Sequence, residues 1–578
     1  MDKEDIAAIF AEMADIMEIL GEDPFRVNSY RKVARVLEES TEDLAALAEA
    51  GQLQTLPGVG KGTAGRIEVL LKTGKLPQQE ELRQKVPPGL LELLTIQGLG
   101  PKTAGKLWKQ AHITSLEALR TALDKDLQQL EAVEGLGPKK LAQIKEAIAF
   151  AESVAGRSTL DEAESVANAL REVVVGCKGA RRVEVAGSFR RWRETVGDID
   201  VLCEASEKQA QGIIAAFASA DRVTKVLAKG KTKGSVVVEG HVQADLRVVP
   251  TRSFGAALQY FTGSKAHNIA LREIAVRKKL KLNEYGLFTE AGKQVAGKDE
   301  QGIYKALGLQ WVPPELREDR GETAAAAAGR LPDLIRLEDI RGDLHMHTTA
   351  SDGHNTIQEM IQACRKLGYK YMAITEHSKG QIQANGLDEQ RLAEHVRAIR
   401  AAAGKHKDIT VLAGIEVDVL KDGRLDFADD VLAGLDFVTA SPHGALAQKR
   451  EEATRRLIKA VENPHVDVIG HPTGRLINRR AGMEIDIVKL AEAAAANDTA
   501  LEVNAHPWRL DLRDVHVKAA VEAGAKLLIC TDAHEADTGG DLWLMRFGVH
   551  TARRGWATAE HVINTWPTAK LKKWLNRR

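Results

Sequence analysis

The sequence of 578 residues is poor in cysteine and carries no net charge. Its cysteines are spread apart without a C-x-x-C pair, at Cys177, Cys203, Cys364 and Cys530. This spacing argues for reduced thiols and against a disulfide framework or a cysteine zinc site. Because 81 basic and 81 acidic residues cancel, the overall charge does not attract polyanions, and any such affinity must come from local patches.

Long apolar runs are also missing. No uninterrupted run approaches the ~20 residues that cross a bilayer, and the acidic start at residues 1–5 lacks an apolar signal core. We therefore expect a soluble, cytoplasmic protein with no membrane partner. The length and the 44% content of hydrophobic residues are sufficient for several domains with full cores.

Acidic residues near the middle of the chain predict a metal-dependent site. Asp198 and Asp200 are separated by one residue, so on a strand they point to the same face. A third acid, Asp245, lies in residues 242–249, which have the pattern of a neighbouring strand. Three converging carboxylates can hold two Mg²⁺ or Mn²⁺ ions, one activating the attacking oxygen and one steadying the leaving pyrophosphate. The alternative is a solvated hairpin whose acids happen to alternate.

A glycine-serine turn comes before these acids. Gly187 and Ser188 offer free backbone N–H groups, and Arg190, Arg191 and Arg193 follow them closely. Both features suit a phosphate ligand. The turn, the arginines and the three aspartates together favour a nucleotidyltransferase with the aspartates as its catalytic residues.

The whole arrangement resembles the family X DNA polymerases. Their sugar-checking and base-pair-checking elements are similar to residues 260–264 and 283–288 of this sequence. The resemblance implies that Tyr260 and Phe261 pack against the incoming sugar, whereas without it they would be ordinary core aromatics. The residues that it assigns to nucleotide binding are Gly187, Ser188, Arg191, Gly197, Tyr260, Phe261, Gly263, Asn268 and Arg272.

The first 150 residues are helical in pattern and contain an internal repeat, at residues 56–64, 96–104 and 133–141. Each copy is an apolar residue, Gly-x-Gly and then a basic residue that opens a helix. The glycines allow a tight turn, and the helix N-terminus offers N–H groups to a phosphate. One copy alone would suit a plain helix C-cap, but three resemble helix-hairpin-helix motifs, which grip the DNA backbone without reading its sequence.

Residues 23–32 resemble the small N-terminal domain of the same family, which binds the downstream 5′-phosphate in a gap. Family members that remove abasic sugar phosphates use a lysine after the first hairpin, where this sequence has Arg66. A guanidinium is a poor imine former, so classical lyase activity is not expected at that residue. The residues expected to contact DNA are Arg26, Tyr30, Gly58, Gly60, Lys61, Gly98, Gly100, Lys102, Gly135, Gly137 and Lys139.

The last third of the sequence has its own repeating pattern. Seven short apolar runs between residues 344 and 534 alternate with helical stretches, and each run ends in a metal-type residue. Strands that alternate with helices imply a parallel sheet, and function at the strand C-termini is the layout of a β/α barrel. Seven units rather than eight favour a distorted (β/α)₇ barrel.

This part resembles the PHP (polymerase and histidinol phosphatase) domain, which in bacteria is often fused behind a family X polymerase. Mixed imidazole and carboxylate ligands suit two or three Zn²⁺, Mn²⁺ or Fe²⁺ ions better than Mg²⁺ alone. The metal ligands that the resemblance implies are His345, His347, Asp352, His377, Glu416, His443, His471, Asp532 and His534. A single histidine at a strand end would more often be structural, but nine ligand-type residues at matching ends disfavour that explanation.

Five further residues near the same strand ends are assigned supporting roles. Arg475 and Arg509 are expected to clamp a phosphate of the substrate. His506 is expected to face the substrate or to support a ligand. Glu376 and Asp418 are expected to orient ligands through hydrogen bonds.

The expected fold is therefore multidomain, α+β and α/β, with a helix-hairpin-helix N-terminal region, a nucleotidyltransferase palm and a C-terminal PHP barrel. The expected parts are a small 5′-phosphate-binding domain, a helix-hairpin-helix domain, the palm, a subdomain for the nascent base pair, a linker and the PHP domain. Their boundaries are 1–80, 81–155, 156–250, 251–315, 316–338 and 339–578.

The expected function is template-directed filling of short gaps in base excision repair, using dNTPs on gapped or primer-template DNA. The PHP site would act as a 3′→5′ exonuclease or process abasic sites or 3′-phosphates. One rival is a phosphatase of small monoesters attached to a DNA-binding module, and another is a non-catalytic clamp for DNA ends. A monomer is expected, while the identity of the PHP metal and the placement of the barrel stay open.

Overall fold

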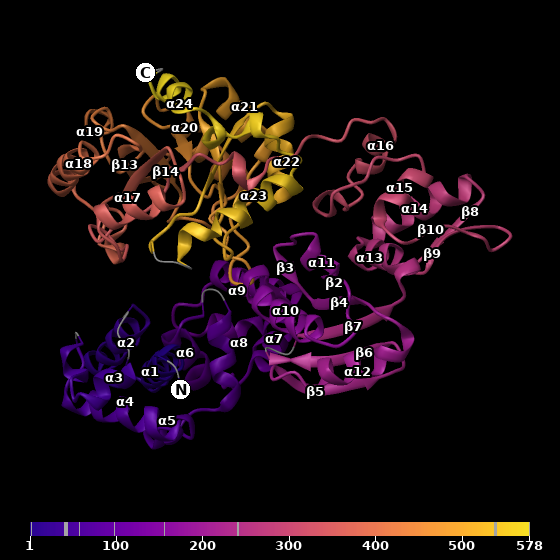
Figure 1. The fold of residues 1–578 in the computed structure, drawn as a ribbon. Helices are drawn as coiled ribbons and strands as arrows, with labels where there is room; N and C mark the ends of the chain where they lie inside the picture. The colour runs from indigo at the N-terminus through magenta and orange to yellow at the C-terminus, as the bar shows by residue number, and fades with distance from the viewer. Residues whose placement is uncertain are drawn as a thin grey trace. The chain divides into compact units, whose positions relative to one another are not determined.

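The computed structural model describes residues 1, 3–39, 44–56, 58–96, 99–154, 156–239, 242–536 and 540–576. These residues form two compact units, Met1–Ala155 and Gly156–Arg578 (Figure 1). In the part of the chain so described, no helix is long and apolar enough to cross a membrane. The four cysteines are unpaired, and three of them are buried.

The first unit is built of helices around one apolar core. Three of its helices follow the glycine hairpins, namely α4 (Lys61–Thr73), α6 (Pro101–Ala111) and α9 (Pro138–Val154). The other helices are α1 (Lys3–Leu20), α2 (Pro24–Glu39), α3 (Leu44–Glu49), α5 (Pro77–Arg83), α7 (Leu116–Lys125) and α8 (Leu127–Glu131). The helical N-terminal region expected from the periodicity is confirmed.

The second unit begins with a five-stranded sheet in the order β2-β4-β7-β6-β5. Its strands are β2 (Val183–Val185), β4 (Asp198–Glu204), β5 (Val223–Lys229), β6 (Lys233–Val238) and β7 (Gln243–Val249). Strands β4 and β7 are parallel neighbours, and the other pairs are antiparallel. Helices α10 (Leu160–Val175) and α12 (Glu207–Ala218) contribute their apolar faces to the core of this sheet.

A smaller helical and antiparallel part follows the sheet. It contains α13 (Phe254–Thr262), α14 (Lys265–Arg277) and α15 (Glu300–Ala306), with the strands β8 (Leu280–Asn283), β9 (Gly286–Thr289) and β10 (Gln294–Ala296). Its own core includes Leu271, Leu287 and Ile303. Helices α13 and α14 meet at Gly263 and Ser264, next to the sheet's acidic strand.

The third part of the second unit is a barrel of seven parallel strands in chain order. A bridge from Met346 to Ala533 brings the first and last strand ends together, which nearly closes the barrel. Helices that alternate with the strands, such as α17 (Ile357–Lys366), α18 (Glu389–Ala403), α20 (Arg450–Val461), α21 (Ile487–Ala496), α22 (Asp514–Glu522) and α23 (Met545–Arg554), lie around it (Figure 1). The strands are β11 (Gly342–Asp343), β12 (Tyr371–His377), β13 (Thr410–Asp418), β14 (Phe437–Ser441), β15 (Val468–Ile469), β16 (Ala500–Asn504) and β17 (Lys526–Cys530). The expected (β/α)₇ barrel is confirmed.

Residues 314–339, which include the linker expected at 316–338, form a connector that is held by ion pairs. The connector contains η5 (Pro314–Leu316), α16 (Glu322–Ala327) and η6 (Leu337–Asp339). Arg317 is fully buried and lies 2.6 Å from Glu300 of α15, and Glu315 lies 2.7 Å from Arg553 of α23. The segment is therefore fixed to the parts on either side of it, because its buried charges find partners in both.

Glu315 makes this packing dependent on pH. Burial by itself raises the pKa of its carboxyl group, but His550 and Arg553 outweigh it and lower the pKa from 4.5 to about 2. A carboxyl group with a lowered folded pKa stabilises the fold fully above its unfolded pKa, and this contribution is lost as the pH falls toward the folded value. The stabilisation is therefore complete above about pH 4.5 and disappears between about pH 4.5 and pH 2.

We expect Glu315→Gln to destabilise the second unit by about 3 kcal/mol at neutral pH. Calorimetric unfolding midpoints of the variant and the wild type should converge as the pH falls below about 4.5. Glu560→Gln is the matched control, since Glu560 is exposed, and its midpoint should follow the wild type throughout. A midpoint difference for Glu315→Gln that is independent of pH would contradict the explanation by the lowered pKa of Glu315.

Candidate functional site

The first candidate site lies where the parallel strands β4 and β7 run side by side. Their register places Asp200 directly opposite Asp245, and Asp198 stands at the start of β4. Burial, followed by the charges of Asp198 and Asp245, raises the pKa of Asp200 to about 7. Crowded carboxylates of this kind are relieved by a cation, and an all-oxygen donor set suits Mg²⁺ or Mn²⁺.

The negative charge of Asp245 is compensated by neighbouring side chains more fully than that of Asp200. Lys233 on the adjacent strand β6 places its Nζ 3.0 Å from an Asp245 oxygen. Burial alone would raise the pKa of Asp245, but bonds from Ser235 and Lys233 lower it. The carboxyl group is therefore ionised at neutral pH, as a cation ligand must be.

The expected glycine-serine turn forms the short helix α11 (Gly187–Arg190), which follows β2 and lies against these carboxylates. Gly187 has a φ of +65°, and a Cβ atom there would come within 3.0 Å of Asp200 Oδ2. The Ser188 hydroxyl is buried and has no hydrogen-bond partner among the described residues. An unpartnered buried hydroxyl at this turn fits a ligand with acceptor oxygens, as a phosphate would provide.

A cavity of about 780 Å³ opens beside the turn and the acids. Asp198 and Asp200 line it, as do all of the expected nucleotide-binding residues except Gly197. Gly197 is not among the lining residues, and a Cβ atom there would meet Nη1 of Arg157, which is one of them, at 2.8 Å. The complete lining is Arg157, Gly187, Ser188, Arg191, Arg193, Asp198, Asp200, Tyr260, Phe261, Gly263, Ser264, Lys265, Asn268 and Arg272.

Helices α13 and α14 form the far wall of this cavity. The Tyr260 and Phe261 rings meet edge to face at 5.1 Å, and the Arg247 guanidinium stacks on Phe261 at 4.5 Å. Asn268 is fixed by two hydrogen bonds, donating to the Tyr260 carbonyl at 2.7 Å and accepting from Gln259 at 2.7 Å. The side chains expected to test the sugar and the base pair are thus held in defined positions.

The arginines after the turn differ in their contacts. Arg190 pairs with Glu300 at 2.8 Å and so joins the sheet to α15. Arg191 lines the cavity, and its Nε lies 3.0 Å from Glu318. Sequence reasoning missed Arg157 and Glu318 here, because neither lies near the motif and no local pattern marks them.

The second candidate site lies at the C-terminal ends of the barrel strands. Three groups of side chains there have donor atoms within 4.8 Å of one another. The groups are His347, Asp352, His377 and His534; then His345, His347 and Asp532; and then His377, Glu416 and His443. His347 and His377 each belong to two groups, so the groups form one continuous centre.

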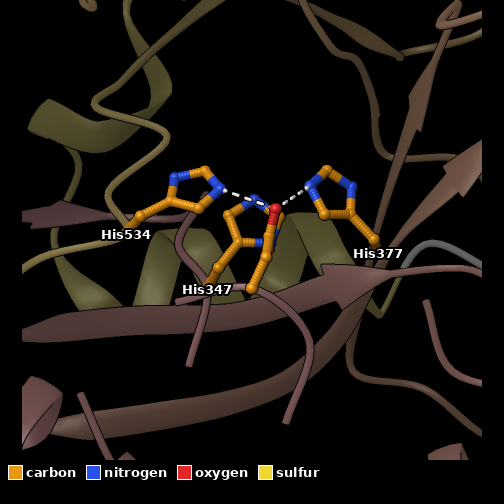
Figure 2. A group of neighbouring side chains, drawn as sticks. His347, His377 and His534 are labelled. Atoms are coloured by element: carbon orange, nitrogen blue, oxygen red, sulfur yellow. Dashed lines mark ion pairs between the residues drawn. The ribbon is translucent and has the colours of Figure 1, made fainter. Parts of the chain in front are cut away.

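The first group converges on a carboxylate. Asp352 Oδ2 lies 3.4 Å from His377 Nε2 and 3.5 Å from His534 Nε2 (Figure 2). The His347 ring stacks on both neighbouring rings, with centroids 4.3 Å from those of His377 and His534. His347 and Asp352 come from the loop after β11, His377 ends β12 and His534 follows β17, so the group is drawn from three neighbouring strand ends.

Glu416 at the end of β13 is the centre of the remaining ligands. It lies 2.9 Å from His471, 3.3 Å from His443 and 3.4 Å from His345. Five buried ring nitrogens here make no hydrogen bond within the described part of the chain, although Glu416 lies close to three of them. They are His345 Nε2, His347 Nδ1, His377 Nδ1, His443 Nε2 and His471 Nδ1. Buried imidazole nitrogens without partners fit metal ions such as Zn²⁺, Mn²⁺ or Fe²⁺.

Carboxylates behind the ligands fix which ring nitrogen faces the centre. His345 Nδ1 lies 2.7 Å from Glu502, and His443 Nδ1 lies 2.5 Å from Asp418. Each pair leaves the Nε2 lone pair free for a metal. Glu502 was not predicted, although an acid in the middle of the apolar run of β16 is a signal that could have found it. Glu376 instead bonds Thr348 and Ser351.

The two expected phosphate clamps are placed differently. Arg509 Nε lies 3.7 Å from Asp532, so its side chain reaches the metal-ligand cluster. Arg475 bonds the carbonyls of Arg509 and Leu510 and lies 2.8 Å from Glu194, with a side chain only 7% exposed. These three contacts occupy its guanidinium and correct the prediction, because Arg475 joins the barrel to the palm rather than facing a substrate. The His506 ring accepts a bond from the Trp508 amide.

The hairpins of the first unit expose most of the residues that the motif assigns to DNA binding. Gly58, Gly60, Gly100, Gly135 and Gly137 are exposed, while the apolar residue between each pair of glycines is buried. Lys61, Lys102 and Lys139 are exposed beside them, and Gly98 lies outside the described residues. Arg26 pairs with Glu22, whereas Tyr30 is only 9% exposed and packs on Phe10. Its aromatic ring therefore belongs to the core.

The carboxylate of Asp352 provides a test of the second site. We expect Asp352→Asn to lose about one metal ion per chain, because a neutral amide is a much weaker ligand. Metal content would be measured by elemental analysis after loading with Mn²⁺ or Zn²⁺ and desalting. Asp426→Asn is the control, since Asp426 bonds Ser378 and Gly380 and belongs to none of the ligand groups. Equal metal content in both variants would contradict the assignment.

Family models match the chain in order along its length. A helix-hairpin-helix domain matches residues 1–76, a SAM-like helix-hairpin-helix tandem 90–149, a DNA polymerase beta palm 158–256, a DNA polymerase beta thumb 257–318 and a PHP domain 343–506. The order agrees with the parts expected from the motifs.

Similar proteins agree with these matches. The chain is 39% identical over 580 residues, covering all of both chains, to the DNA polymerase/3′-5′ exonuclease PolX of Bacillus subtilis (strain 168). It is 27% identical over 326 residues to DNA polymerase lambda of Rattus norvegicus, covering 51% of this chain and 53% of the relative. A probable phosphatase of Shewanella halifaxensis is 30% identical over 239 residues, covering 40% of this chain and 90% of the relative. The chain therefore belongs to the family X DNA polymerases that carry a C-terminal PHP domain.

Proposed function

We propose that the chain fills short gaps in DNA by template-directed addition of deoxynucleotides, as a step of base excision repair. The observation that carries this is the Asp198, Asp200 and Asp245 cluster beside a cavity large enough for a nucleotide. Mg²⁺ or Mn²⁺ ions held by these carboxylates would supply activation of the attacking oxygen and stabilisation of the leaving pyrophosphate. Ser188 and the cavity arginines would bind the triphosphate, while Asn268 and Arg272 would face the nascent base pair.

The barrel is proposed to shorten DNA from the 3′ end. Two or three Zn²⁺, Mn²⁺ or Fe²⁺ ions would supply an activated water for attack on a phosphodiester. The shared histidines, the central Glu416 and the bonds from Glu502 and Asp418 support a site that is built to hold them. Arg509 would contact a phosphate of the substrate, and the 3.7 Å between its Nε and Asp532 supports this role.

The substrates proposed for both sites are gapped or primer-template DNA, held through its backbone by the three hairpins. The complete polymerase cluster disfavours a small-molecule phosphatase, and the metal-binding geometry of the barrel disfavours a non-catalytic clamp. Lyase activity through Arg66 is not proposed, since that guanidinium bonds Gln78 at 2.6 Å. A primer-extension assay on a one-nucleotide gap with a 5′-phosphate, with and without dNTPs, tests both activities together.

Variants of one site should lose that site's activity and keep the activity of the other site. Asp200→Ala is expected to reduce extension by about 10³-fold or more and to leave shortening intact, because its carboxylate belongs only to the first site. The double variant His345→Ala and His347→Ala should do the reverse. Each protein would be assayed in Mn²⁺ for extension of gapped DNA with dNTPs and for shortening of the same DNA without them. Loss of both activities from either change, in a protein that keeps the wild-type melting temperature, would refute the two-site proposal.

The hairpin lysines are expected to bind backbone phosphates. Replacing Lys61, Lys102 and Lys139 with alanine should weaken binding to any DNA sequence and reduce the salt slope by about 0.9 per lost contact. The dissociation constant would be measured by fluorescence anisotropy over a range of salt concentrations.

The control for this experiment replaces Lys75, Lys85 and Lys125 with alanine. These lysines are exposed in the same unit but lie outside the hairpins in sequence. An equal change of slope in the control would show that the hairpins are not the binding surface.

A further inference from the structure

A buried glutamate of the connector holds the arginines of the nucleotide cavity. Glu318 is 9% exposed at its side chain, and its carboxylate lies 3.0 Å from Arg191 Nε and 3.5 Å from Arg193 Nη1. Both arginines line the cavity beside Asp198 and Asp200. Glu318 itself is not among the lining residues, so it contacts the arginines from behind.

Arg191 is fixed at several points. Its Nη1 donates to the carbonyl oxygen of Thr262, at the end of α13, while its Nε is bound to Glu318. Neither of these bonds uses the Nη2 group, and a guanidinium carries five N–H donors in one rigid plane. The side chain is therefore oriented before any ligand arrives.

Glu318 is in turn held by the barrel. Arg554 of α23 lies 3.1 Å from the Glu318 carboxylate, and it also donates to the backbone carbonyl of Arg191 at 2.6 Å. Arg554 is buried and pairs with Asp514 of α22 at 2.6 Å. A continuous series of charged contacts thus runs from two barrel helices through the connector to the polymerase cavity.

The charges explain why this arrangement needs Glu318. Three guanidinium groups meet around one carboxylate, and without it Arg191, Arg193 and Arg554 would repel one another. Burial alone would raise the pKa of Glu318, but Arg554, Arg191 and Arg193 lower it, so the carboxyl group is charged at neutral pH. Its removal would free Arg191 to adopt other rotamers, which binding of a ligand would then have to restrict.

We propose that Glu318 is a positioning residue for nucleotide binding, through which the PHP barrel sets the affinity of the polymerase site for dNTPs. Anchored by Arg554, it orients Arg191 toward the triphosphate. The inference rests on the proposed polymerase function and adds to it a role of the barrel that does not depend on the barrel's own chemistry.

The test compares two connector glutamates. Glu318→Gln should raise the KM for dNTP in gap filling about tenfold and change kcat by less than about twofold, because the catalytic carboxylates are untouched. Arg554→Met, which removes the barrel's contact with Glu318, should also raise the KM for dNTP. Glu315→Gln is the matched control, since Glu315 pairs with Arg553 and His550 of the same helix and contacts no cavity arginine. Its KM should equal that of the wild type.

Nucleotide affinity would also be measured directly by calorimetric titration of dATP with Mg²⁺, which needs no turnover. If the wild type does not extend a gap, the proposed polymerase function fails, and the titration still decides the role of Glu318. An unchanged or lowered KM and dissociation constant in Glu318→Gln would overturn the inference. The same rise in Glu315→Gln would overturn it too, because general loosening of the connector would then be the cause.

Discussion

Both centres of this protein bury groups that repel one another or lack partners. At strands β4 and β7 the parallel register forces Asp200 and Asp245 together, and burial in a low dielectric makes their repulsion costly. In the barrel, several buried imidazole nitrogens make no hydrogen bond within the described part of the chain. Cations bound between the ligands would relieve this repulsion and satisfy the nitrogens, so metal binding would stabilise the fold at both centres.

The two centres differ in the chemistry of their donors, and this separates their proposed roles. The polymerase centre offers carboxylate oxygens alone, which suit ions that also bind the oxygens of a nucleotide triphosphate. The barrel centre mixes imidazoles with carboxylates, which suit ions that hold an activated water. The backing acids Glu502 and Asp418 are required only in the second case, because only an imidazole must be fixed in one tautomer.

Much of this could be predicted where the signal is local in sequence. The spacing of Asp198 and Asp200, the repeated Gly-x-Gly turns and the histidines after apolar runs each follow from the period of one element, and the family models agree with them. Residues such as Arg157, Glu318 and Arg475 could not be assigned in this way. Their partners are far away in sequence, and only the tertiary fold brings the charges together. The sequence likewise predicted a linker at 316–338, although Arg317 and Glu322 are buried there.

The ion pairs of the connector have a consequence for how such a chain can evolve. In sequence the barrel is a separate module, but Glu315 and Glu318 find their partners Arg553 and Arg554 in it. A gene truncated before the barrel would encode a polymerase in which Glu315 has lost His550 and Arg553, and Glu318 has lost Arg554. Ion pairs and apolar contacts that the barrel provides would be lost with them, which is destabilising. The stability of the polymerase part therefore depends on the barrel, although the two are separate domains in the sequence. Loss of metal ligands from the barrel by substitution would cost the fold less than loss of the barrel itself.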